Sequence, residues 1–176
     1  MTLRIIPSGA TLGARIENLD LSQPLPDDVF DELLQALGHH GVLSYPKQEL
    51  TPAQLRAFSA GFGRLEVNVA DAYQEPGLPE VMVLSNIMEN GKPIGLSDAG
   101  QDWHTDMSYS HMIAFTNVLY GMQIPHRDGQ PLGNTEFCNM HAAYEGLAEE
   151  WKQRLDGMTV LHDFDKFWEM MRRERG

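Results

Sequence analysis

The chain has 176 residues, enough for one domain with a hydrophobic core, and a hydrophobic content of 42% with a mean hydropathy of −0.34 is typical of a soluble globular protein. The sequence contains no apolar run near the roughly 18 residues of a membrane helix and no secretory signal, so we expect a cytoplasmic protein that contacts no membrane. The net charge of −12 argues against a nucleic-acid partner, because phosphate binding relies on clustered Lys and Arg.

The first third of the chain predicts short strands and two helices. Residues 3–7 and 12–19 are typical of strands. From Asp27 or Asp28, apolar residues recur at helical spacing, with Gly38 and Gly41 beyond the expected end. The sequence therefore predicts an amphipathic helix after two strands.

A strand at 41–46 and a second helix follow. Thr51 is the expected N-cap of that helix, and Pro52 suits its first position. Residues 68–79 and 88–101 have loop composition, and we interpret the second as a rim or lid beside a site.

The remaining chain mixes strand and helix patterns at irregular spacing, which favours a mixed α+β sheet. Its single cysteine, Cys138, cannot form an internal disulfide, which suits a reducing compartment, and we expect it to be buried. The expected strands are 80–87, 102–109, 114–125, 135–139 and 158–164, and the expected helices are 139–155, in one or two pieces, and 165–176.

A histidine and an aspartate stand two residues apart in "DWHTDMSY". In a strand, His104 and Asp106 would point to the same face, with Cα atoms about 6.6 Å apart. An imidazole and a carboxylate projected together supply two ligands of a 2-His-1-carboxylate Fe(II) site, which needs one further histidine. The pair is therefore a candidate metal site.

Other readings of these residues stay open. A second His-x-Asp pair, His126 and Asp128, follows a proline and precedes a glycine, so we interpret it as the hydrated tip of a turn. A zinc hydrolase using the first pair is a further alternative, although the sequence offers no convincing third ligand. The other histidines are more typical of structural or surface positions.

Several stretches in consistent order, "LSNI", "NGKPIG", "WHTDMSY", "LGNTEF", "AAYEGL" and "HDFDKFWEMMRRERG", together resemble one family. They are similar to the Fe(II)- and 2-oxoglutarate-dependent dioxygenases of the taurine and 2,4-dichlorophenoxyacetate dioxygenase type. The resemblance implies that His104 and Asp106 bind iron. It also implies that Thr135, in the "GNTEF" turn, contacts the 2-oxoglutarate carboxylate.

The substrate side of the resemblance departs from sulfonate-handling relatives. These carry a histidine shortly after "FG-x-L", where this chain reads Glu66, Val67 and Asn68, and an asparagine where it has Gly100. The departure argues against taurine as the substrate. Candidate substrate contacts are Asn68, Trp103 and Met107, although core packing explains the last two equally well.

The family fold implied is a distorted double-stranded β-helix, or jelly roll, with flanking helices. Family members continue for roughly a hundred further residues, which carry the distal histidine and an arginine that binds 2-oxoglutarate, so we expect residues 1–176 to form one incomplete domain of that fold. The implied function is hydroxylation of a small organic substrate with release of succinate and CO₂.

The alternative is a non-catalytic remnant that acts, if at all, in association. Purified alone, residues 1–176 should show no measurable 2-oxoglutarate decarboxylation. They should also tend to form homo-oligomers through exposed sheet edges.

Overall fold

The computed structural model describes residues 3–68, 73–97, 100, 102–166 and 169. The chain divides into two compact units, the first made of 1–83 with 118–147 and the second of 84–117 with 148–176. The elements are β1 (Arg4–Pro7), β2 (Ala14–Glu17), α1 (Asp27–His40), β3 (Leu43–Ser44), α2 (Pro52–Ala60), β4 (Gln74–Glu75), β5 (Leu78–Met82), β6 (Met88–Glu89), β7 (Lys92–Pro93), β8 (His126–Arg127), β9 (Gln130–Pro131), α3 (Met140–Glu145) and α4 (Glu149–Leu155).

The first unit begins with a three-stranded sheet in the order β1-β2-β3. β1 and β2 are antiparallel, whereas β2 and β3 are parallel. Side chains alternate between its faces: Ile16 is buried against the core, while Arg4 and Arg15 each lie 3.0 Å from Glu17 on the other face. The two N-terminal strands predicted from the sequence are confirmed, and the third is shorter than predicted.

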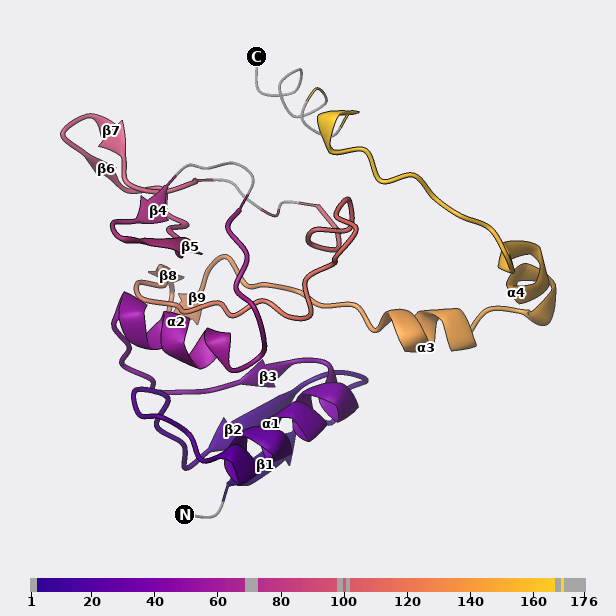
Figure 1. Cartoon of the computed structure of the whole chain (residues 1–176), viewed down its shortest axis with the longest axis horizontal. Helices are drawn as coiled ribbons and strands as arrows, with labels where there is room; N and C mark the ends of the chain where they lie inside the picture. The colour runs from indigo at the N-terminus through magenta and orange to yellow at the C-terminus, as the bar shows by residue number, and fades with distance from the viewer. Residues whose placement is uncertain (1–2, 69–72, 98–99, 101, 167–168, 170–176) are drawn as a thin grey trace. The chain divides into compact units, whose positions relative to one another are not determined.

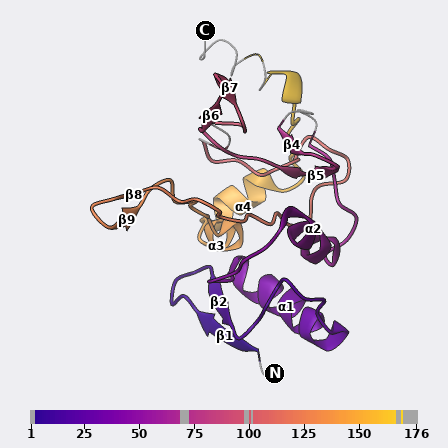
Figure 2. The ribbon, with the colours of Figure 1, turned by 90° about the vertical axis from the view of Figure 1, so that its left-hand side faces the viewer.

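Helix α1 covers the inner face of this sheet, as Figures 1 and 2 both show. It begins at Asp27, as predicted, but it continues through Gly38, which the sequence had placed beyond its end. The helix stops at Gly41, whose φ of +70° is left-handed and whose missing Cβ would lie 2.6 Å from Leu12. The helix therefore ends at Gly41, which is left-handed, and not at Gly38.

Helix α2 begins as the sequence predicts. Thr51 accepts a hydrogen bond from the backbone of Gln54, whose side chain in turn accepts from the Thr51 backbone, and Pro52 occupies the first position. Phe58 faces inward and packs edge-on against Tyr45 at a ring distance of 5.6 Å. The buried cluster that holds the first unit together consists of Ile16, Leu21, Leu33 and Phe58.

An ion pair joins α2 to β5. Two nitrogens of the Arg56 guanidinium, Nε and Nη2, donate to the Glu80 carboxylate at 3.1 and 3.0 Å. The hydrogen-bonded guanidinium lowers the pKa of Glu80. β5 spans Leu78–Met82, so the predicted strand begins earlier and ends sooner than the sequence indicates.

Two tight hairpins interrupt segments that the sequence treats as turns or loops. β6 and β7 are joined by Asn90-Gly91, and β8 and β9 by Asp128-Gly129, with positive φ at all four linking residues. Figure 2 shows both as narrow ribbons. The turn predicted at 126–128 is confirmed, whereas 88–101 contains a hairpin that the sequence analysis missed.

Three predicted strands are wrong: 114–125, 135–139 and 158–164 have no strand assignment. Residues 114–120 still alternate in exposure, because Val118 packs on the core and Leu119 is 64% exposed. They find no partner strand among the described residues, so no ladder forms. Cys138 in the same part of the chain is exposed, which corrects its predicted burial.

The helical prediction for 139–155 is confirmed in two pieces, α3 and α4. Most of the helix predicted at 165–176 lies outside the described residues. None of the sheets formed by the described residues is closed, so the jelly roll stays a prediction. No helix among these residues is long and apolar enough to cross a membrane.

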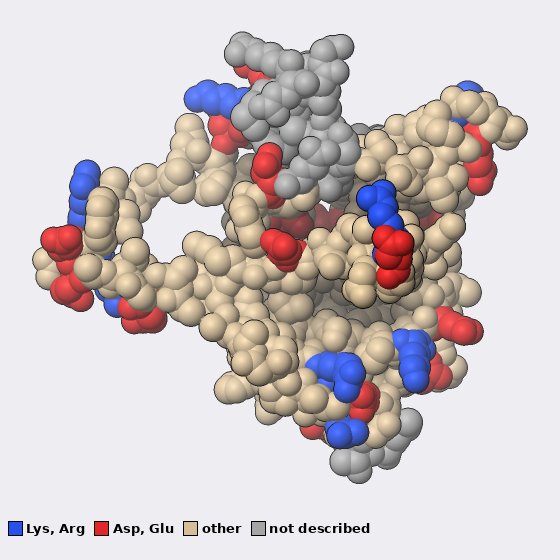
Figure 3. Space-filling view, turned by 180° about the vertical axis from the view of Figure 1, so that it is seen from behind, with Lys and Arg blue, Asp and Glu red and all other residues tan. Residues whose placement is uncertain are grey.

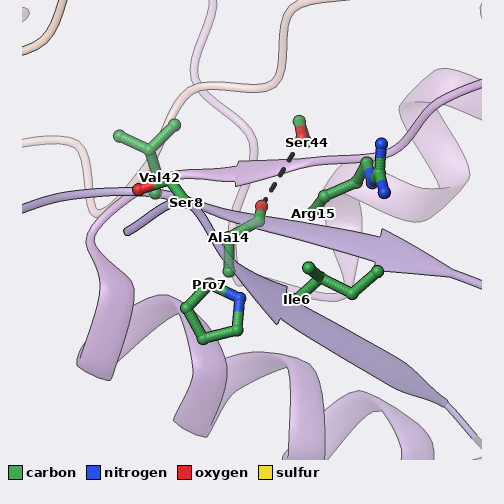
Figure 4. Close-up of a pocket in the computed structure, with 8 residues that line it drawn as sticks. Ile6, Pro7, Ser8, Ala14, Arg15, Val42 and Ser44 are labelled. Atoms are coloured by element: carbon green, nitrogen blue, oxygen red, sulfur yellow. Dashed lines mark hydrogen bonds between the residues drawn. The ribbon is translucent and has the colours of Figure 1, made fainter. Parts of the chain in front are cut away.

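A pocket of about 280 Å³ lies on the β1-β2-β3 sheet (Figure 4). The Ser44 hydroxyl donates to the Ala14 carbonyl beside it. Arg15 is its one charged lining residue, and this guanidinium already pairs with Glu17. On the face in Figure 3, basic side chains lie scattered with acidic ones nearby.

Candidate metal centre

The His-x-Asp pair lies in an irregular segment that ends in a turn, so the strand predicted at 102–109 is wrong. Met107 has φ of +56°, a left-handed conformation that no strand contains, and the Ser110 N–H donates to the Met107 carbonyl at 2.9 Å. The chain therefore folds back directly after Asp106.

The turn nevertheless brings the two side chains together. His104 Nε2 lies 3.0 Å from Asp106 Oδ1, and each side chain is about half exposed, at 49% and 52%. His104 Nδ1 lies 2.6 Å from the Asp102 carbonyl oxygen. Because a carbonyl oxygen only accepts, Nδ1 carries the proton, and the lone pair of the neutral ring is on Nε2.

This arrangement fits a metal ion by the chemistry of its donors. In the neutral ring, two lone pairs face each other across 3.0 Å, which is favourable only with a proton or a cation between them. An imidazole nitrogen and a carboxylate oxygen are two of the ligand types that a divalent transition metal would take. The carbonyl on Nδ1 is also the partner that commonly orients a metal-binding histidine.

Further contacts hold the turn, and no sequence pattern predicts them. Asn117 Nδ2 donates to Asp106 Oδ2, and Ser108 Oγ lies 2.9 Å from His162 Nδ1. The Tyr109 ring packs against Phe164 at 4.5 Å. Burial raises the pKa of Tyr109, and the nearby Asp106 charge raises it further.

No third histidine, cysteine or carboxylate joins His104 and Asp106 within the described ranges. His162 bonds Ser108, on the turn itself, and His111 is exposed. Two protein ligands are therefore what this part of the chain offers.

The second His-x-Asp pair differs in geometry. His126 lies on β8 and Asp128 in the turn that links β8 to β9. Both are exposed, and no ion pair within 4.0 Å joins these two described residues. His126 Nδ1 lies 2.9 Å from the Ile124 carbonyl, so its ring is oriented much as that of His104 is. The two His-x-Asp pairs therefore differ in the carboxylate, which lies against the imidazole in His104–Asp106 and does not in His126–Asp128.

The remaining predicted site residues are distributed over both units. Trp103 and Met107 flank the His104–Asp106 pair in sequence. Trp103 is 69% exposed, so core packing does not explain it, and Met107 is half-buried. Thr135 and Asn68 belong to the first unit and are exposed. Their roles stay predictions.

Gly100 lies beside His104. Its φ is +72°, and a Cβ there would lie 3.4 Å from Cε1 of His104. A side chain at this position would therefore touch the imidazole ring, and glycine leaves that side of the ring open.

Comparison with known proteins identifies the family. The profile of the taurine catabolism dioxygenase TauD, TfdA family matches residues 4–174, and the chain belongs to this family. The resemblance inferred from the motifs is thus confirmed.

Two curated relatives are similar to most of this chain. The chain is 31% identical over 172 residues to pentalenolactone F synthase of Streptomyces avermitilis, covering 96% of this chain and 55% of the relative. It is 29% identical to the alpha-ketoglutarate-dependent 2,4-dichlorophenoxyacetate dioxygenase of Cupriavidus pinatubonensis, covering 89% and 56%.

A solved taurine dioxygenase from Burkholderia xenovorans, 24% identical, shares the fold over 89% of this chain and 52% of its own, with a TM-score of 0.66. The chain spans about half the length of the curated relatives it matches.

Proposed function

We propose that this chain carries the metal-binding turn of an Fe(II)- and 2-oxoglutarate-dependent dioxygenase that hydroxylates a small organic substrate. When bound, Fe(II) with 2-oxoglutarate supplies the means to reduce O₂, placing one oxygen atom in the product alcohol and the other in succinate, with loss of CO₂. Membership of the TauD, TfdA family supports this reaction class. The distorted jelly roll is the fold we propose for the whole enzyme, and a cytoplasmic location stays a prediction.

The residues of the turn would each have a definite task. His104 would bind the metal through Nε2, because its Nδ1 is held by the Asp102 carbonyl. Asp106 would bind through Oδ1 and contribute the negative charge that favours a divalent cation. Trp103 and Met107 would form part of the substrate pocket wall, and Asn68 is the third proposed substrate contact.

One observation carries the proposal: the Nε2 to Oδ1 distance of 3.0 Å with Nδ1 already bonded. It is tested by Co(II) titration of the chain, followed by absorption spectroscopy and calorimetry. His104→Ala and Asp106→Ala should each weaken binding by at least about tenfold, since each removes one of two protein ligands.

The matched control is the second pair. His126→Ala and Asp128→Ala should leave Co(II) affinity within about twofold, because their side chains do not converge. Equal losses at both pairs would indicate adventitious surface binding and would refute the proposed site.

Thr135 is the proposed contact for the 2-oxoglutarate carboxylate. Thr135→Val in an active, longer form of the protein should raise the 2-oxoglutarate KM about tenfold, the scale of one hydrogen bond to a charged group. Thr11→Val, at another exposed threonine, is the control. An unchanged KM would remove Thr135 from the site.

A second candidate function, association without catalysis, is favoured by one observation. Leu119, Met122 and Ile124 are 64%, 81% and 49% exposed within one short segment of the first unit. Several exposed apolar side chains close together in the chain are typical of an interaction surface. Concentration-dependent sedimentation that Leu119→Glu abolishes would support it, and a monomer at all concentrations would exclude it for this chain alone.

A further inference from the structure

The two oxygens of the Asp106 carboxylate have different partners. Oδ1 faces His104 Nε2 at 3.0 Å, and Oδ2 accepts a hydrogen bond from Asn117 Nδ2 at 2.5 Å. Asn117 lies eleven residues further along the chain and in the same unit. The sequence motif ends at Asp106 and contains no hint of this partner.

The contact holds the Asp106 side chain in one orientation. Asn117 and Asp106 are both exposed, so water competes for the same groups and limits what the hydrogen bond adds to stability. Without a partner, an exposed aspartate samples several rotamers, most of which turn Oδ1 away from the imidazole. The amide removes that freedom.

We propose that Asn117 is a positioning residue for the metal site, an inference that rests on the proposed function. By donating to Oδ2, it turns Oδ1 toward His104 Nε2 and fixes the spacing of the two ligand atoms. With Oδ2 engaged, Asp106 binds through one oxygen and not through both. A single-oxygen carboxylate leaves one more coordination position open, and a site that must also take 2-oxoglutarate and O₂ needs that position.

The test uses the whole 176-residue chain and Co(II), whose visible absorption depends on coordination number. Asn117→Leu keeps the approximate side-chain size and removes the donor. It should weaken Co(II) binding about 10- to 100-fold, the usual cost of losing a hydrogen-bond partner of a ligand. Any bound Co(II) should show an altered visible spectrum, because both Asp106 oxygens become available.

Rescue and control variants separate positioning from folding. Asn117→Gln restores an amide donor at an exposed position where the longer side chain can bend back, so it should recover most of the affinity. Gln123→Leu, at another exposed amide on the same segment, should change nothing. Circular dichroism and the metal-free Tm should be equal in all variants. If Asn117→Leu fails this check, Asn117→Ala, which also removes the donor, is used with the same expectation.

A double-mutant comparison completes the design. In the Asp106→Ala background, Asn117→Leu should cost no further affinity, because the amide acts only through that carboxylate. An Asn117→Leu affinity within twofold of wild type, or an equal loss in both backgrounds, would overturn the positioning role. If His104→Ala and Asp106→Ala also leave Co(II) binding unchanged, both the proposed metal pair and the role of Asn117 are refuted. If these two substitutions weaken binding, only the role of Asn117 is refuted.

Discussion

The two units of the chain are built by different means. The first has a buried apolar cluster around Ile16, Leu33 and Phe58. In the described part of the second unit, no hydrophobic side chain is buried. The contacts that hold the candidate site there include the Ser108–His162 hydrogen bond, the Asp106–Asn117 hydrogen bond and the Tyr109–Phe164 ring contact. The proposed metal pair lies in the second unit, so its geometry depends on polar partners and on the backbone turn.

The largest expected effect would come from the core of the first unit. Leu33→Ala removes a side chain that is 0% exposed, and it should lower the free energy of unfolding by about 2–5 kcal/mol. Leu161→Ala, at a position 82% exposed in the second unit, should stay within about 0.5 kcal/mol. Urea denaturation followed by circular dichroism measures both, and similar losses would contradict the contrast between the units.

Helix capping should give the next largest effect. Thr51→Ala removes the hydroxyl that accepts from the Gln54 backbone and should cost about 1 kcal/mol. Thr105→Ala, at an exposed threonine between His104 and Asp106 that caps no helix, is the control. If only Thr51→Ala lowers the free energy of unfolding in the same urea assay, the capped helix contributes to the stability of the first unit. Equal losses for the two variants would argue against this.

The first unit is also the part best predicted from sequence, because its signals are local. The helix-start pattern at Thr51 and Pro52 gives the second helix without knowledge of the fold. The first helix differs from the prediction only at its end, because it continues through Gly38 and stops at Gly41. The side chain of Leu12, far away in the sequence, leaves no room for a Cβ at Gly41, and a local pattern does not reveal this contact.

Strands were predicted less well, since a strand exists only with a partner. The segment 114–125 has the composition of a strand, and 114–120 has the alternating exposure of one, yet no described strand pairs with it. Conversely, the Asn90-Gly91 hairpin carried a clear local signal, two residues that favour positive φ, which a loop interpretation overlooked.

The candidate site was found for a reason that was partly wrong. Spacing by two residues brings side chains together in a strand, and His104 and Asp106 do meet, but they meet in a turn after which Met107 is left-handed. Asn117 and His162 lie 11 and 54 residues from their partners, so no local pattern predicts them.

A smaller effect should come from the contact that anchors the turn in the second unit. Ser108→Ala and His162→Ala should each make the turn open more often. The interaction energy between the two substitutions should be about 0.5 kcal/mol, the low end for a net hydrogen bond. Hydrogen exchange of the Ser110 amide, which bonds the Met107 carbonyl, reports the opening. His111→Ala is the control, and additive effects of the two substitutions would show that the contact does not couple the segments.

The smallest effect concerns the ion pair between α2 and β5, whose partners remain in contact with water. The Arg56 guanidinium lowers the folded-state pKa of Glu80 below its ordinary value, while the unfolded chain keeps that value. The unfolded state therefore binds more protons as acid is added. The stabilising contribution is present above the unfolded pKa and is lost as the pH falls through the lower, folded one.

Acid titration of stability should reveal this pair. In Glu80→Gln, the acid loss of stability between about pH 5 and pH 3 should be shallower than in the native chain. At neutral pH the two proteins should differ little, because partly exposed pairs contribute little. Glu89→Gln, at an exposed carboxylate on β6 in the second unit, should leave the slope unchanged. Identical slopes for Glu80→Gln and the native chain would mean that the ion pair makes no contribution to stability in solution.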